Sequence, residues 1–106
     1  MSSNTIFTEE SLLMAVTISK DFRTFIEQRL DECRAGQKAI STINELNFDT
    51  LYLASVLQYR WRQSPPCIKS LASQAGVSLS SGYKYRNTLI EKLATQIDNV
   101  IVPVYE

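Results

Sequence analysis

The stretch of sequence that decides the fold reads Ile68-Lys69-Ser70-Leu71-Ala72-Ser73-Gln74-Ala75-Gly76-Val77-Ser78. Leu71 and Ala75 lie on one face of a short helix, and the small side chain of Ala72 lets a second helix cross at close range. Gly76 allows the positive φ with which the chain can leave the first helix in a short turn. Ser78 can accept a hydrogen bond from the free amides of the next helix. The stretch therefore predicts two helices joined by a tight turn.

This pattern resembles the helix-turn-helix motif of bacterial, phage and plasmid transcription regulators, and the resemblance covers residues 65–93. It implies DNA binding, with the second helix in the major groove. Gly82 departs from the pattern, because the second helix usually presents Val or Ile to the first helix there. Either Gly82 lies within the second helix and permits a close approach, or the turn runs over residues 77–81 and the second helix begins near Gly82. A helix that begins near Ser78 has these inward positions: Gly82, Tyr85, Leu89 and Leu93.

Charge is distributed unevenly along the chain, although the formal net charge is zero. Residues 1–53 hold five basic and eight acidic side chains, whereas residues 54–97 hold six basic side chains against Glu91 alone. The basic segment coincides with the predicted motif, as the binding of a polyanion requires. This coincidence favours double-stranded DNA as the partner.

The outward positions of the second helix offer side chains that recognise DNA. Asn87 can bind adenine through two hydrogen bonds, and Lys84 and Arg86 can bind guanine or phosphate. Tyr83 suits an interface but could instead cover the helix pair. Arg60 and Arg62, at the end of the preceding helix, could bind the DNA backbone. Trp61 between them is expected in the core. The candidate DNA-binding residues are Ser78, Ser80, Ser81, Tyr83, Lys84, Arg86, Asn87, Lys69, Arg60 and Arg62.

Helical periodicity continues through the rest of the chain. We expect helices over residues 9–16, 20–35, 50–63, 66–75 and 78–97, and a shorter one around Ile40, Ile43 and Leu46. The expected N-caps are Thr8, Ser19 and Asp49, and Gly36 is an expected C-terminal cap. Val100 to Tyr105 predicts an extended strand, which Pro103 confines to an edge or a bulge. The sequence thus predicts a mostly α fold of five to six helices, with a helix-turn-helix in the C-terminal half and one short C-terminal β-strand.

A chain of 106 residues is long enough for one domain. Within it, residues 1–48 form N-terminal helices and a candidate dimerisation region, residues 49–97 the DNA-binding region, and residues 98–106 the terminal strand. Proteins with this motif often act as two-fold dimers, so the acidic N-terminal half and the terminal strand are the candidate association surfaces. The strand could pair with a second subunit or with a short strand around residues 5–7.

The leading hypothesis is a sequence-specific transcription regulator, most simply a repressor, that binds double-stranded DNA as a homodimer. Some such regulators activate transcription by contacting RNA polymerase. The alternative is a protein-interaction module of the same fold, such as an adaptor or antirepressor, that binds another regulatory protein. An enzyme is disfavoured, because the chain has no His to activate its Ser and Thr hydroxyls and no glycine-rich phosphate loop.

No cofactor is expected. Cys33 and Cys67 are far apart and form no Cys-x-x-Cys motif, which argues against a zinc site. Buried free thiols are favoured over a disulfide, which remains open. The N-terminus lacks the charged start of a signal peptide, and the longest uncharged apolar stretch is too short to span a membrane. We therefore expect a soluble cytoplasmic protein.

Overall fold

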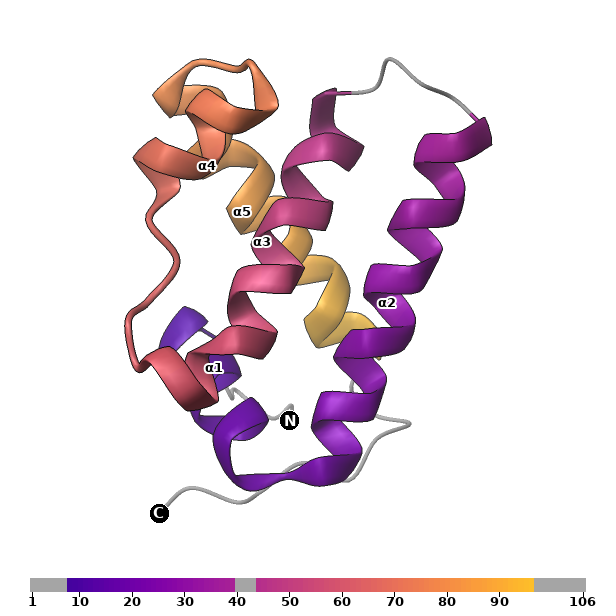
Figure 1. Ribbon diagram of the computed structural model, residues 1–106, viewed down its shortest axis with the longest axis vertical. Coiled ribbons are helices and arrows are strands. Elements are labelled where there is room, and N and C mark those ends of the chain that lie inside the picture. Colours follow the sequence, from indigo (N-terminus) through magenta and orange to yellow (C-terminus); the bar gives the residue numbers. More distant parts are fainter. Residues whose placement is uncertain (1–7, 40–43, 97–106) are drawn as a thin grey trace.

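The computed structural model describes residues 8–39 and 44–96, and these residues form five helices (Figure 1). The helices are α1 (Glu9–Ile18), α2 (Lys20–Ala39), α3 (Asn44–Arg62), α4 (Ile68–Ala75) and α5 (Leu79–Gln96). The expectation of a mostly α fold is confirmed. The strand expected over residues 100–105 lies outside the described residues. Within the described ranges, no helix combines the length and the apolar character needed to cross a lipid bilayer.

Side-chain caps set the boundary between the first two helices. The Thr8 hydroxyl accepts a hydrogen bond from the amide of Ser11 at 3.2 Å, which begins α1. Ser19 ends α1, because its amide donates to the carbonyl of Ala15 at 2.9 Å. Its hydroxyl accepts from the amide of Phe22 at 3.1 Å, so the same residue begins α2. The N-caps predicted at Thr8 and Ser19 are confirmed.

The central helix of the fold is α3, which contacts each of the other four helices. Figure 1 shows α2 running beside α3, with α4 near the beginning of α3 and α1 near its end. The Phe48 ring lies 6.0 Å from the Tyr52 ring and 6.1 Å from the Tyr85 ring of α5, measured between centroids. The largest fully buried side chains come from every helix except α4: Tyr52, Phe22, Phe48, Leu12, Ile26, Leu53, Leu93, Val16 and Val56.

Two helix ends predicted from the sequence are wrong. Asp49 does not begin a helix, because α3 already begins at Asn44 and Asp49 is buried within it. Gly36 does not end α2, which continues to Ala39. A Cβ atom on Gly36 would lie 3.2 Å from Cδ1 of Leu46, the end of a flexible side chain in α3, so Gly36 lies where α2 passes α3 and not at a helix end. Packing between α2 and α3 overrides both local signals. Of the short helix expected around residues 40–46, residues 44–46 are described, and they belong to α3.

The connection from α3 to α4 follows the predicted proline signal. α3 ends at Arg62, and Gln63 adopts the left-handed conformation with φ 55°. Its amide still donates to the carbonyl of Tyr59 at 2.7 Å. Pro65 and Pro66 follow, and neither has an amide hydrogen with which to continue a helix. α4 begins at Ile68, two residues later than predicted, and ends at Ala75 as expected.

Candidate nucleic-acid interface

A three-residue turn joins α4 to α5. Gly76 adopts φ 76° and ψ 29°, in the left-handed region, as its place in the sequence predicts. The amide of Gly76 donates to the carbonyl of Ser73 at 3.1 Å, and the amide of Val77 donates to the carbonyl of Ala72 at 2.9 Å. The Ser78 hydroxyl accepts from the amide of Ser81 at 3.2 Å and thereby caps α5. Local hydrogen bonds therefore fix where each helix stops and starts.

Gly82 lies inside α5 and is buried against α4. A Cβ atom on Gly82 would lie 3.0 Å from Cβ of Ala72 and 3.3 Å from Cγ2 of Ile68. Only a glycine permits the two helices to approach this closely. The close-approach interpretation of Gly82 is therefore correct. The alternative, in which the second helix begins near Gly82, is wrong because α5 begins at Leu79.

The surface of α5 opposite this contact is open. Ser80, Tyr83, Lys84 and Asn87 are exposed, and Ser81 is half-buried. The inward positions predicted for this register are buried at Gly82, Leu89 and Leu93, whereas Tyr85 is half-buried against the core. Leu79 also belongs to the open surface, with 45% of its area exposed, although the sequence analysis did not select it. Its spacing of four from Tyr83 and eight from Asn87 is the signal that could have identified it.

Arg86 is tied to α1 instead of projecting freely. Its side chain is 22% exposed, and its Nη1 lies 3.6 Å from Oε1 of Glu9. Its Nε donates to Oδ1 of Asn87 at 3.0 Å, and its guanidinium carbon lies 5.3 Å from the centre of the Tyr83 ring. Oε2 of Glu9 accepts a hydrogen bond from the Tyr52 hydroxyl at 2.6 Å. Sequence reasoning missed Glu9, since nothing local indicates that α1 and α5 meet.

The Tyr52 hydroxyl is protonated under all ordinary conditions. Burial raises its pKa well above the usual value of a tyrosine, and the hydrogen bond to Glu9 raises it further. Tyr52 is therefore a constant donor that holds Glu9 in place beside Arg86. The result is a polar connection from α3 through α1 to the edge of the open surface of α5.

The end of α3 carries two of the predicted basic residues. Arg60 and Arg62 are both exposed, and Arg60 stacks on Trp61 with 4.8 Å between its guanidinium carbon and the ring centre. Trp61 itself is 69% exposed, so its predicted place in the core is wrong. It follows Tyr52 by nine residues, which places it on the opposite side of the helix from that buried ring. Lys69 is exposed in the first turn of α4.

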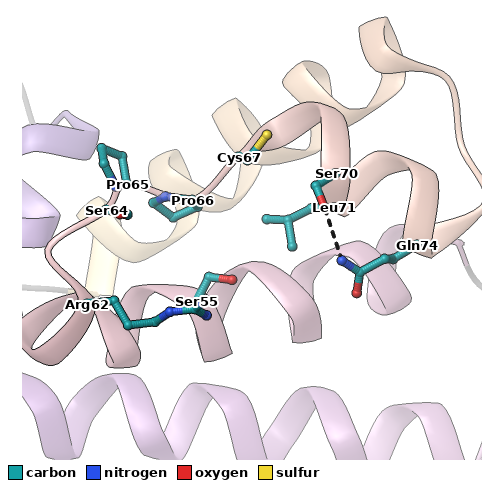
Figure 2. Close-up of a pocket in the computed structure, with 9 residues that line it drawn as sticks. All are labelled: Ser55, Arg62, Ser64, Pro65, Pro66, Cys67, Ser70, Leu71 and Gln74. Atoms are coloured by element: carbon teal, nitrogen blue, oxygen red, sulfur yellow. Dashed lines mark hydrogen bonds between the residues drawn. The ribbon is translucent and has the colours of Figure 1, made fainter.

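A hollow of about 310 Å³ separates the second half of α3 from the 64–67 connection and α4. Figure 2 shows Arg62 and Ser55 of α3 on one side and the prolines of the connection on the other. On α4, Nε2 of Gln74 donates to the Ser70 hydroxyl at 3.2 Å. Arg62 donates to Gln58 at 3.0 Å and is the only charged side chain among the lining residues that the structure describes. Its guanidinium and the hydroxyl groups around it can donate hydrogen bonds to an anion.

Asp49 is a carboxylic acid buried in the core. Burial, and after it the charge of Glu45, raise its pKa to about 7 against the opposing effect of Lys92. Its Oδ1 is buried without a hydrogen-bond partner among the described residues. Burial also raises the pKa of the nearby Cys33 thiol, and the charge of Asp49 adds to this effect. These groups lie between α2, α3 and α5, away from the surface of α5 described above.

Both cysteines are free. Cys33 is half-buried, but Cys67 is exposed, so the expectation that both thiols are buried is wrong for Cys67. The reason is its place at the start of α4, where Ile68 packs inward instead. In the described part of the chain, no three His, Cys, Asp or Glu side chains are grouped so that they could hold a metal ion.

Comparison of the chain with protein-family models, with curated proteins and with solved structures found no match. What this surface can bind is therefore inferred from its own residues.

Proposed function

We propose that the chain is a sequence-specific regulator of transcription that binds double-stranded DNA. The observation that supports it is the α4–α5 pair, in which a turn at Gly76 and the contact between Ala72 and Gly82 leave one polar side of α5 open. The major groove of DNA is about 12 Å wide and admits one α-helix. In helix-turn-helix proteins the second helix enters this groove with its first residues at the base edges. α5 takes that role in the proposal.

The exposed side chains divide into those that can read bases and those that can bind the backbone. Asn87 has the amide that adenine can pair with, and Lys84 can donate to guanine. Arg86 contributes less charge than the sequence suggests, because Glu9 pairs with it. It serves instead to orient Asn87, whose Oδ1 it contacts. The hydroxyl groups of α5 that can contact phosphate belong to Ser78, Ser80, Ser81 and Tyr83.

Four cations of the C-terminal half remain for the phosphate backbone. Lys92 lies 3.9 Å from Glu45, and Arg86 is paired with Glu9. The others are exposed and have no acidic partner within 4.0 Å in the described ranges: Arg60, Arg62, Lys69 and Lys84. If each meets one phosphate, the logarithm of the binding constant should fall with the logarithm of salt concentration with a slope of about −4. A surface of this kind suits a polyanion.

The proposed regulator acts in the cytoplasm as a homodimer. A two-fold dimer would place two copies of α5 about 34 Å apart, on half-sites one helical turn away from each other. Occupation of such a site would exclude other proteins from it, which makes repression the simplest mode of action. Contact with RNA polymerase would instead give activation.

Fluorescence anisotropy of a labelled random duplex, titrated with the full chain at several salt concentrations, tests the proposal. We expect affinity to fall steeply with salt. The variant Lys69→Glu/Lys84→Glu should lose binding. The variant Lys20→Glu/Arg34→Glu changes the charge equally at exposed positions of α2 and should bind like the parent. Equal losses in both variants would mean that binding follows net charge and not the α4–α5 surface.

A second function has one specific observation in its favour. Met14 and Ile18 of α1 are 49% and 56% exposed, so α1 presents apolar side chains to the outside. Such a surface suits an adaptor or antirepressor that binds another regulatory protein. Absence of duplex binding even at low salt would refute the DNA-binding proposal and favour this one. Binding to such a protein would depend weakly on salt, since its contacts are apolar.

A further inference from the structure

The first two turns of α5 carry an apolar patch on the open surface. It consists of Leu79 and Tyr83, which are 45% and 44% exposed and lie four residues apart, so they are neighbours on the helix. The close contact with Ala72 and Ile68 of α4 is made by Gly82. The residues around this patch are polar. Burying the leucine and tyrosine side chains is favourable only if the partner that covers them is itself apolar.

Arg86 contacts the tyrosine of the patch and the neighbouring Asn87. The Arg86 guanidinium lies 5.3 Å from the centre of the Tyr83 ring, and its Nη1 lies 3.6 Å from Oε1 of Glu9 in α1. Arg86 also donates to Oδ1 of Asn87 at 3.0 Å. The ring of Tyr83 and the amide of Asn87 are therefore oriented before any ligand arrives. A surface oriented in advance loses less conformational entropy on binding.

The only methyl group on the base edges of the major groove is the C5-methyl of thymine. A purine would place the polar N7 edge against Leu79 and leave that edge without water or a partner, and cytosine lacks the methyl group. We infer that the apolar patch of Leu79 and Tyr83 binds the C5-methyl group of thymine, so that the protein selects sites with thymine opposite the beginning of α5. This inference rests on the proposed function and names the base chemistry of the same surface.

Asn87 extends the same row of side chains. It follows Leu79 by eight residues, which corresponds to about 12 Å along the helix axis. Its amide can form two hydrogen bonds with adenine. The open surface of α5 thus offers an apolar group that fits thymine and, at a different base pair, an amide that fits adenine. We expect A·T pairs to dominate the selected half-site.

Deoxyuridine gives a direct test, because it differs from thymidine only in lacking the methyl group. A duplex is first selected with the full chain from a random library. Each thymine is then replaced by uracil in turn, and affinity is measured by fluorescence anisotropy. At one or more positions, the parent should lose affinity about fourfold, the factor for one buried methyl group. Leu79→Ala should bind thymine and uracil duplexes equally well at that position.

Met14→Ala is the matched control, since Met14 is similarly exposed but lies on α1. This variant should retain the full thymine preference. The inference is overturned if no uracil replacement weakens binding by the parent, or if Leu79→Ala keeps the same preference for thymine. Either of these results leaves DNA binding itself intact. Failure to bind any duplex refutes the proposed function together with the inference. Circular dichroism should show unchanged helix content in Leu79→Ala, because this side chain lies outside the core.

Discussion

Replacing Gly82 by alanine tests the close approach of α4 and α5, on which the position of the open surface depends. A methyl group on Gly82 would lie 3.0 Å from Cβ of Ala72 and 3.3 Å from Cγ2 of Ile68. It would also lie 3.4 Å from Cε2 of Phe48. Carbon atoms in contact normally lie about 3.5–4.0 Å apart, so the two helices would have to separate slightly. Overpacking of this kind costs about 1–3 kcal/mol of unfolding free energy.

Gly36→Ala is the matched control, because Gly36 also lies inside a helix. A methyl group there would meet Cδ1 of Leu46 at 3.2 Å, and this atom is the end of a side chain that can rotate away. Both substitutions gain about 1 kcal/mol of helix propensity, so that gain cancels when the two variants are compared. We expect the Gly36→Ala protein to be as stable as the parent or more so. The Gly82→Ala protein should be less stable than the control by about 1–3 kcal/mol.

Urea unfolding of the full chain, followed by circular dichroism, measures both variants. Adding Ala72→Gly to Gly82→Ala removes the nearest carbon atom. The double-mutant cycle should then show a favourable coupling of about 0.5–2 kcal/mol between the two sites. If Gly82→Ala is as stable as Gly36→Ala, or if the effects at positions 72 and 82 simply add, the two helices do not cross in contact and the reasoning is refuted.

The remaining predictions concern pH, the turn and the DNA contacts. Asp49 has a pKa of about 7 in the fold against 3.8 ordinarily, so the folded state binds its proton more tightly and stability is lost as the pH rises from 4 through 7. In urea titrations, the unfolding free energy of Asp49→Asn minus that of the parent should therefore increase by roughly 2–3 kcal/mol from about pH 5 to pH 8. The same pH dependence in both proteins would contradict this prediction. Gly76→Ala, on backbone with φ 76°, should lower the unfolding free energy by about 1–2 kcal/mol, and no loss would argue against the left-handed turn. In the anisotropy assay, Asn87→Ala should weaken binding to the selected duplex alone, by about 1–3 kcal/mol. An equal loss for every duplex would mean that Asn87 binds the DNA backbone. Arg60→Ala should weaken binding to every duplex and reduce the salt slope by about 1.

Local signals in the sequence predicted the helix ends that depend on neighbouring residues. Thr8, Ser19 and Ser78 each cap a helix with a hydroxyl that accepts from an amide three residues later. Gly76 takes the left-handed conformation that a short turn requires. These interactions are complete within one turn of the chain, so they can be recognised without knowing the rest of the fold.

The same kind of signal failed where packing decides. Gly36 and Asp49 are a good C-cap and a good N-cap by residue type, yet both lie within helices. α2 and α3 pack along their length, and burial of Phe48 and its neighbours stabilises continuous helix through Asp49. That stabilisation exceeds the small local preference for a helix end. The residues next to Gly36 and Asp49 in the sequence do not indicate that packing will continue the helix through them.

By itself, the sequence determined the helical class, the left-handed turn at Gly76 and the caps at Thr8 and Ser19, because propensity and hydrogen bonds over three or four residues set them. It left open whether α5 begins before Gly82 or near it, and the structure decided this by placing Gly82 inside α5 against Ala72. Only the tertiary structure decided which sides of the helices are covered. It left Trp61 and Leu79 exposed, and it brought Glu9 to Arg86 from the other end of the chain. Burial and pairing depend on which helices pack together, and those contacts join residues whose separation in sequence leaves no local pattern.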